Sequence, residues 1–388
     1  MYESGGRPIQ WLAFLWPALA AAAARDTAGL IARQCTGLAI GAEDGRPVPE
    51  PPFTTENTIA LDLKSVRLRD FSIDPAGPVT LLCAPFALHG AVLADLAPGH
   101  SLVAALRAAG LRRLFVADWR SATPEMRFRG IDDYLADLNV LVDRIGGSVD
   151  LIGLCQGGWL ALLYAARFPG KVRKLVIAGA PIDIGAASSP LSMLAQSNPL
   201  ALFEELVMLG DGRVLGHRIA QFWSLQPVDR EQIHAMLQMP EAIDSPAFAG
   251  LAAAFNAWNA WTFDLPGTYY LEVVNKLYKR NALAGGEFVA LGQTIDLKEV
   301  RIPLYLLAAR DDELVAPDQL FAAARLVGTP PHKIGRTLAP CRHLGLFMGH
   351  DTLSNHWPRI VAWMQARDMP KPSSAPEKDE RAPPTIAA

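Results

Sequence analysis

The sequence is poor in cysteine. Its 388 residues contain four cysteines, Cys35, Cys83, Cys155 and Cys341, and no two of them form a CxxC pair. Cysteines this few and scattered argue against a disulfide framework and against a zinc site, and they are typical of a reducing compartment. No glycine-rich phosphate loop or metal-ligand cluster is evident. We therefore expect a cytoplasmic protein that needs no cofactor and no metal.

An excess of charge of one sign is also lacking. The chain has 36 Lys and Arg residues against 39 Asp and Glu residues, for a formal net charge of −3. A nearly balanced chain of this kind has no electrostatic basis for binding nucleic acid or an anionic membrane surface. We therefore expect neither as a partner.

A hydrophobic run long enough to span a bilayer is missing as well. Residues 9–24 are mostly apolar but contain Pro17, and a membrane-spanning helix needs ~20 such residues. Arg7 before the run and the alanines at its end are consistent with a signal peptide, whereas Glu3 and the thin positive region speak against one. We favour a helix that lies on the core, on a partner or on an apolar surface.

Composition along the chain divides it into five parts. Residues 1–56 comprise the apolar segment and an irregular linker, and residues 368–388 are rich in Pro, Ser, Ala and charge, which predicts a disordered tail. Strand and helix patterns alternate over 57–184 and again over 299–367. Residues 185–298 between them are mainly helical and rich in aromatics, which indicates a cap inserted into an α/β core, with ordinary additional core as the alternative.

Short continuous apolar runs predict the strands of that core. They occupy residues 79–84, 114–117, 149–154, 174–178, 302–309 and 334–339, and helical spacing predicts helices at 102–109, 131–145, 159–168 and 353–366. Continuous apolar strands separated by helices are typical of a mostly parallel sheet that is buried on both faces. The fold class is therefore predicted to be α/β.

The residues between one such strand and the next helix carry the chemistry. Gly153-Leu154-Cys155-Gln156-Gly157 has the form GxCxG, which is the nucleophile-elbow pattern of α/β-hydrolase folds with Cys in place of Ser. The glycines are needed because the nucleophile lies in a sharp, strained turn whose neighbours must lack bulk. The following helix N-terminus would favour a thiolate. The alternative is a small buried cysteine in a tight turn.

The partners of such a nucleophile follow it in the order acid, then histidine. Asp311 and Asp312 come directly after the strand at 302–309, where ligands bind in parallel sheets, although an exposed acidic turn would look the same. His343 lies between the strand at 334–339 and the closing helix, and its order, spacing and loop placement favour it over the other histidines. Those competitors are His89, His100, His217, His234, His332, His350 and His356.

Two backbone amides would stabilise the oxyanion formed at Cys155. One is that of Gln156, and the other comes from the loop after residues 79–84, near Phe86 or Ala87. We assign Trp159, in the helix that follows the elbow, and Trp261, in the cap, to substrate binding. The aromatic residues of the cap could line an apolar channel. Packing within the cap itself is an equally good interpretation of these aromatics.

With these residues in place, roughly residues 75–366 resemble the group of polyhydroxyalkanoate synthases and intracellular polyhydroxybutyrate depolymerases. The resemblance implies the α/β-hydrolase fold and a Cys155–His343–Asp312 triad, and it is the reason for choosing Asp312 over Asp311. The segments similar to synthases are GLCQGG (153–158), LLYAARFPGKVRKLV (162–176), GEF (286–288), IDLKEVRIP (295–303) and DELVAP (312–317).

Other segments resemble the depolymerases instead. They are DWRSA (118–122), DDYL (132–135), APID (180–183), DLPGTYYLEVVNKLY (264–278), HLGLFMG (343–349) and WPRIVAWM (357–364). Two positions depart from that branch, which usually has Pro where Gly157 stands and Gly where Arg342 stands. The branch is therefore not fixed by the resemblance.

The resemblance implies acyl chemistry on hydroxyalkanoate esters or thioesters. Our first interpretation is a hydrolase that cleaves polyhydroxyalkanoate polymer or oligomers through an acyl-enzyme. The alternative is a synthase that polymerises 3-hydroxyacyl-CoA, and a further alternative is a non-catalytic protein bound to polyester granules. The sequence leaves open whether residues 9–24 contact a granule or membrane surface. It also leaves open whether the protein forms a homo-oligomer.

Overall fold

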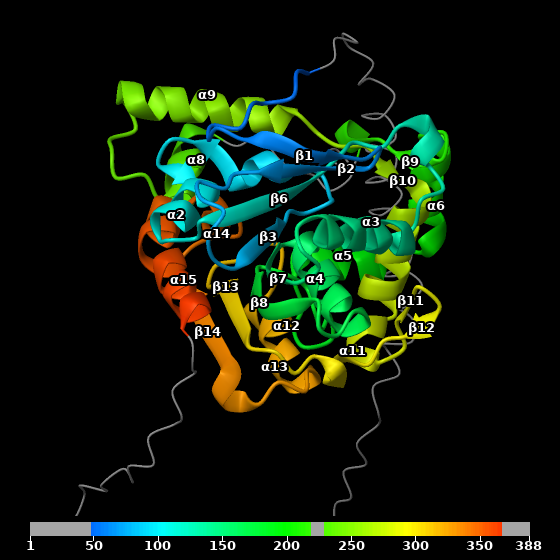
Figure 1. The fold of residues 1–388 in the computed structure, drawn as a ribbon. Coiled ribbons are helices and arrows are strands. Elements are labelled where there is room, and N and C mark those ends of the chain that lie inside the picture. The colour runs from blue at the N-terminus through cyan, green and yellow to red at the C-terminus, as the bar shows by residue number, and fades with distance from the viewer. Residues whose placement is uncertain (1–47, 219–228, 367–388) are drawn as a thin grey trace, which may run out of the picture.

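The computed structural model describes residues 48–218 and 229–366, and an eight-stranded sheet forms its centre (Figure 1). The strand order is β1-β2-β6-β3-β7-β8-β13-β14. The antiparallel pairs are β1–β2 and β2–β6, and all other neighbours are parallel. The strands are β1 (Thr58–Asp62), β2 (Val66–Asp70), β3 (Val79–Cys83), β6 (Arg113–Trp119), β7 (Val149–Leu154), β8 (Val172–Ala178), β13 (Leu304–Ala309) and β14 (Ile334–Ala339). The predicted α/β fold with a mostly parallel sheet is confirmed.

The central strands are buried on both faces, which explains their continuous apolar sequences. Every residue of β3 and β7 is buried. Neighbouring residues along a strand enter opposite halves of the core: Leu81 packs in one hydrophobic cluster and Leu82 in the other. A parallel sheet needs this double cover because its crossover helices lie on the two faces.

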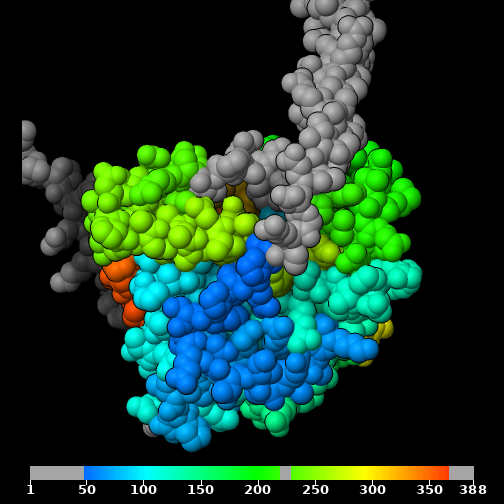
Figure 2. All heavy atoms as spheres, turned by 90° about the horizontal axis from the view of Figure 1, so that it is seen from above, coloured from blue at the N-terminus to red at the C-terminus, as the bar shows by residue number. Residues whose placement is uncertain are grey.

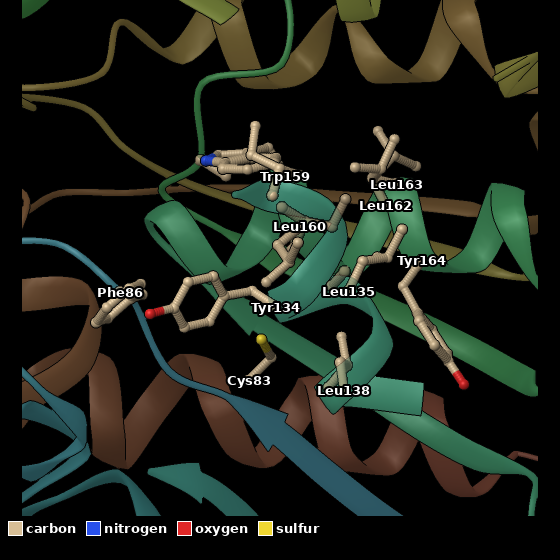
Figure 3. Packing of buried hydrophobic residues seen from close by; sticks show 14 of the residues in the cluster. Cys83, Phe86, Tyr134, Leu135, Leu138, Trp159, Leu160, Leu162, Leu163 and Tyr164 are labelled. Carbon is tan, nitrogen blue, oxygen red and sulfur yellow. The ribbon is translucent and has the colours of Figure 1, made fainter. Parts of the chain in front are cut away.

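Helices cover each face of the sheet. On one face lie α3 (Ile131–Arg144) and α4 (Gln156–Arg167), whose apolar side chains interlock as Figure 3 shows. On the other face lie α2 (Leu102–Ala108), α14 (Gly345–Met348) and α15 (Trp357–Gln365). The first residue of α4 directly follows Cys155, so that helix begins three residues before the predicted start at residue 159.

Several short elements connect these layers. They are β4 (Asp95–Ala97), β5 (His100–Ser101), α12 (Pro317–Phe321), α13 (Ala323–Leu326), the 3₁₀ helices η1 (Ala91–Ala94), η2 (Pro124–Met126), η4 (Leu297–Glu299) and η5 (Pro331–Lys333), and the π-helical turn η6 (Thr352–His356).

Between β8 and β13 the described chain is mainly helical, and we call residues 185–218 and 229–298 the helical insertion. Its elements are α5 (Pro190–Ser197), α6 (Leu200–Leu209), α8 (Arg230–Leu237), α9 (Pro246–Ala260), α10 (Gly267–Glu272), the π-helical η3 (Val273–Lys279) and α11 (Ala282–Gly285), with the strand pairs β9 (Arg213–Val214)–β10 (Leu265–Pro266) and β11 (Val289–Ala290)–β12 (Gln293–Thr294). In the view from above in Figure 2, α9 (yellow-green) lies at the left of the molecule and the segment around α6 (green) lies at the right.

The two ends of the helical insertion are joined through one buried carboxylate. Asp183, just after β8, is only 7% exposed. Its Oδ1 accepts hydrogen bonds from Asn281 Nδ2 at 2.8 Å and from the Gly185 backbone at 3.0 Å. Its Oδ2 accepts one from Arg325 at 2.5 Å. Asp183 therefore ties the beginning of the helical insertion to its last helices and to α13.

Residues 9–24 and 368–388, for which we predicted an apolar surface helix and a disordered tail, lie outside the described residues. Within residues 48–218 and 229–366, no helix is long and apolar enough to cross a membrane.

The tie at Asp183 can be tested by its removal. Asp183→Ala removes a buried carboxylate that accepts three hydrogen bonds, so we expect the free energy of unfolding to fall by about 1–3 kcal/mol in urea denaturation. Asp74→Ala is the matched control, because it breaks the exposed Asp74–Arg112 ion pair and surface pairs of this kind contribute little. Equal midpoints for the two variants would contradict a structural role for Asp183.

Candidate active site

The turn between β7 and α4 presents Cys155 in a strained backbone conformation. Its φ is 49° and its ψ is −121°, a region that residues with a side chain rarely adopt. Neighbouring backbone holds the turn, because Cys155 N donates to Ala178 O at 2.8 Å and Gly158 N donates to Cys155 O at 2.8 Å. The turn is therefore fixed from β8 and from within α4.

Three glycines let this turn pack tightly. A Cβ on Gly157 would lie 2.2 Å from the Cys83 carbonyl oxygen, and one on Gly153 would lie 2.6 Å from the Gly158 Cα. A Cβ on Gly158 would lie 2.5 Å from the Ala180 side chain. Because backbone atoms are the obstacles at Gly157, neither proline nor any other residue fits there without moving β3. The departure from the depolymerase pattern at residue 157 thus has a steric cause in this chain.

His343 and Asp312 form a buried pair at the ends of neighbouring strands. Asp312 follows β13 and His343 follows β14, and their side chains are 1% and 2% exposed. His343 Nδ1 donates to Asp312 Oδ2 at 2.8 Å, with Oδ1 at 3.0 Å. The imidazole packs against Gly179 at the end of β8, where a Cβ would lie 3.2 Å from His343 Cε1.

The structure distinguishes between the two adjacent aspartates. Asp312 Oδ1 also accepts the backbone N–H groups of Leu314 and Val315, both at 2.9 Å, which orients its carboxylate toward His343. Asp311 is held instead through its backbone, which donates to Cys341 O at 3.1 Å. The structure therefore places Asp312, and not Asp311, beside the imidazole.

A second carboxylate orients the histidine loop, and the sequence analysis missed it. Glu313 Oε2 accepts the backbone N–H of His343 at 3.2 Å and lies 3.3 Å from Arg342 Nε. Arg342, noted from the sequence only as a departure from the depolymerases, thus pairs with a residue next to Asp312. The run of acidic residues 311–313 was the feature of the sequence that could have indicated this role of Glu313.

His343 is coupled electrostatically to both neighbours. Burial lowers the pKa of His343, but the charges of Asp312 and Cys155, together with hydrogen bonds to their side chains, raise it well above the ordinary value of 6.5. A raised pKa means that the imidazolium is favoured beside a carboxylate and a thiolate. The three groups can therefore act as one proton-transfer unit.

The thiol of Cys155 differs from the two other described cysteines. Cys83 and Cys341 are buried, and burial raises the pKa of Cys83 to about 12 and that of Cys341 to about 11. Cys155 is half-buried and interacts with His343. Because the thiolate is the reactive form of cysteine, Cys155 is the nucleophile candidate among these three.

Gln156 is the first residue of α4, so its backbone N–H has no partner within the helix. Its side chain is held at both ends: Trp159 Nε1 donates to its Oε1 at 2.5 Å, and its Nε2 donates to Tyr278 Oη at 2.9 Å. Trp159 itself is fully buried in the core under α4. Its side chain packs in the core and bonds Gln156, and its assignment to substrate binding stays a prediction.

The loop after β3 contacts the helical insertion. Phe86 is 2% exposed, and its carbonyl oxygen accepts the Tyr269 hydroxyl at 3.3 Å. Trp261 is half-buried, and its carbonyl oxygen accepts His89 Nδ1 at 3.1 Å. Burial lowers the pKa of His89 to about 4, so that its imidazole stays neutral. Trp261 thus holds this loop through its backbone, and its substrate-binding role stays a prediction.

A cavity of about 580 Å³ lies elsewhere, between α9 and the β4–β5 hairpin. His100, His350 and Glu241 are among its lining residues, whereas Cys155, Asp312 and His343 are not. In the described part of the chain, no three His, Cys, Asp or Glu side chains are grouped to hold a metal ion.

Comparisons with known proteins agree with the fold. Residues 100–349 match a family model described as the alpha/beta hydrolase fold. The chain is 27% identical over 304 residues to the poly(3-hydroxyalkanoate) polymerase subunit PhaC of Allochromatium vinosum, covering 75% of this chain and 82% of that protein. The Synechocystis subunit of the same name is 28% identical over 307 residues, covering 75% and 78%. The resemblance to this group is confirmed.

A solved structure shows the same fold at lower identity. A mutant epoxide hydrolase from Bacillus megaterium superposes with a TM-score of 0.51 at 13% identity, covering 80% of this chain and all of that chain. At this identity the similarity concerns the fold alone.

The packing at Gly157 generates a prediction. We expect Gly157→Ala to push α4 away from β3, lowering the free energy of unfolding by about 1–3 kcal/mol and slowing the alkylation of Cys155 by iodoacetamide. Gly250→Ala is the matched control, because that exposed helical glycine has open space around it and alanine is the better helix former. Unchanged stability and alkylation of Gly157→Ala would refute the steric argument.

Proposed function

Because the chain belongs to the α/β hydrolase fold family, we propose that it transfers hydroxyacyl groups through a thioester on Cys155. The observation that carries this proposal is the His343–Asp312 pair at 2.8 Å, buried beside a half-buried cysteine in a strained turn. The acyl donor would be a 3-hydroxyacyl-CoA, and the acceptor would be the hydroxyl end of a polyester chain. A cytoplasmic location at polyester granules goes with this proposal.

The proposed chemistry proceeds through two acyl transfers. His343 takes the proton of the Cys155 thiol, the thiolate attacks the thioester carbonyl, and CoA leaves with the proton from the imidazolium. The terminal hydroxyl of the chain then attacks the acyl-cysteine, gives its proton to His343 and forms the new ester, which regenerates the thiol. Asp312 orients the imidazole and stabilises the imidazolium.

The oxyanion of each step would be bound by backbone amides. The Gln156 N–H, which has no partner within α4, would be one donor, and the loop at Phe86 and Ala87 would supply the other. Each such donor typically lowers the barrier by ~3 kcal/mol.

Polymerisation is now favoured over hydrolysis, which was our first interpretation of the sequence. The two relatives named above are polymerase subunits that align with about three quarters of this chain. The site also fits a reaction that must keep water out, because His343, Asp312 and Tyr278 are each at most 5% exposed. A thioester in such surroundings is protected from hydrolysis until a chain end arrives.

The products of the reaction distinguish polymerisation from hydrolysis. Purified protein offered 3-hydroxybutyryl-CoA and amorphous polyester should release CoA with growth of polymer, and Cys155→Ala should abolish this release. Cys341→Ala, which removes a buried thiol, is the control and should retain activity. Monomer release without polymer growth would instead establish a hydrolase. CoA release that does not depend on Cys155 would contradict the mechanism, and release of neither CoA nor monomer would favour a non-catalytic granule protein.

The charge of Asp312 should determine the alkaline limb of the pH profile. That charge is a main cause of the raised pKa of His343, so Asp312→Asn should lower this pKa, and the imidazolium should be lost at lower pH than in the wild type. We expect the alkaline limb of the CoA-release rate to move toward acid and the rate to fall by about 10²–10⁴-fold. Asp311→Asn is the control, and identical profiles of wild type and Asp312→Asn would contradict the proposed pairing.

A further inference from the structure

Two tyrosines of the helical insertion contact the two segments that would bind the oxyanion. Tyr269 belongs to α10 and Tyr278 to η3, and these helices follow each other without a break. Tyr278 Oη accepts a hydrogen bond from Gln156, and the Tyr269 hydroxyl donates one to the Phe86 carbonyl. One short stretch of the insertion thus reaches both the elbow and the loop after β3.

The contact at Tyr278 fixes the residue that follows the nucleophile. The Gln156 side chain bridges two aromatic residues, with Trp159 Nε1 on its oxygen and Tyr278 Oη on its nitrogen. Trp159 lies three residues along the same helix, whereas Tyr278 lies 122 residues away in the sequence. The hydrogen bond from Gln156 to Tyr278 therefore connects the first turn of α4, which contains the backbone N–H of Gln156, to the helical insertion.

The contact at Tyr269 determines which amide of the loop is oriented. The carbonyl of Phe86 shares a peptide unit with the N–H of Ala87, and the described chain contains no cis peptide bond. In a trans peptide these two groups point in opposite directions. When the Tyr269 hydroxyl holds the Phe86 carbonyl on one side, the Ala87 N–H is turned to the other side. Of the two candidate amides, that of Ala87 is therefore the one whose orientation Tyr269 fixes.

The surroundings of both hydroxyls suit neutral, fixed dipoles. Tyr269 and Tyr278 are 2% and 5% exposed. Burial above all, and also the nearby charge of Cys155, raises the pKa of each tyrosine well above its ordinary value of 10. Both hydroxyls therefore keep their protons while a thiolate forms at Cys155.

We propose that Tyr269 and Tyr278 are positioning residues that hold the Ala87 and Gln156 amides in place for the oxyanion, so that the helical insertion completes the active site. The inference rests on the proposed acyl chemistry at Cys155 and deepens it. The tyrosines act through the two amides and need not touch the substrate.

The test uses two reactions of the same thiol. Acylation of Cys155 passes through an oxyanion, whereas alkylation by iodoacetamide displaces iodide and forms none. Tyr269→Phe and Tyr278→Phe each remove one hydroxyl and keep the ring. We expect each to slow acylation, measured as the first turnover of CoA release, by about 10-fold or more with KM changed less than threefold. Alkylation should stay within twofold of the wild-type rate.

Tyr164→Phe is the matched control, because Tyr164 lies on α4, is fully buried and bonds Asn139 through its hydroxyl at 3.1 Å. It should leave both rates unchanged. Equal losses in acylation and alkylation for the two variants would show a merely structural role, and unchanged acylation would show no role, so either result overturns the inference.

A second acyl donor separates this inference from the proposed function. If wild-type protein is acylated by p-nitrophenyl acetate but not by 3-hydroxybutyryl-CoA, the proposed substrate is wrong, and the tyrosine variants are judged on the p-nitrophenyl ester. If neither donor acylates Cys155, both the function and the inference fall.

Discussion

The close contact between the start of α4 and the end of β3 is the constraint on which the rest of the site depends. Gly157 lies against the Cys83 carbonyl with no room for a side chain, and this contact lets the chain turn sharply enough to hold Cys155 at a positive φ. Strain of this kind persists only where the surroundings over-determine it. Here the backbone of β8 and the central sheet do so, because Cys155 N is bonded to Ala178 O.

The parallel sheet brings the remaining groups to the same edge. Asp312 follows β13 and His343 follows β14, which pair in parallel register, and β13 in turn pairs with β8, the neighbour of β7. Residues that are far apart in sequence thereby meet where the strands end. Burial then strengthens their interaction, since the charges of Asp312 and Cys155 outweigh the cost of desolvating an imidazolium at His343.

The sequence predicted the sheet's parallel part and the elbow because both depend on local patterns. The runs 149–154 and 334–339 are strands with those bounds, and the glycines around Cys155 are explained by the turn itself. The antiparallel strands β1 and β2 were not separately predicted, since β1 has no buried residue and β2 alternates buried apolar residues with half-buried charged ones. The burial of Trp159, the role of Glu313 and the tyrosine contacts depend on tertiary packing, which no local pattern reveals.

Whether an acyl-cysteine is hydrolysed or extended depends on access rather than on the triad, because both reactions use the same nucleophile, base and oxyanion donors. In the described chain, the helical insertion contacts the segments on both sides of the nucleophile. It packs Phe263 against the loop after β3, where Phe263 N is bonded to Leu88 O at 2.8 Å, and its tyrosines reach Phe86 and Gln156. If these tyrosines hold the oxyanion donors as we propose, a movement of the insertion alters access to Cys155 and the oxyanion donors together. Because loss of these donors would slow hydrolysis and transfer alike, the outcome is decided by which acceptor, water or a chain end, reaches the acyl-cysteine while the insertion is in place.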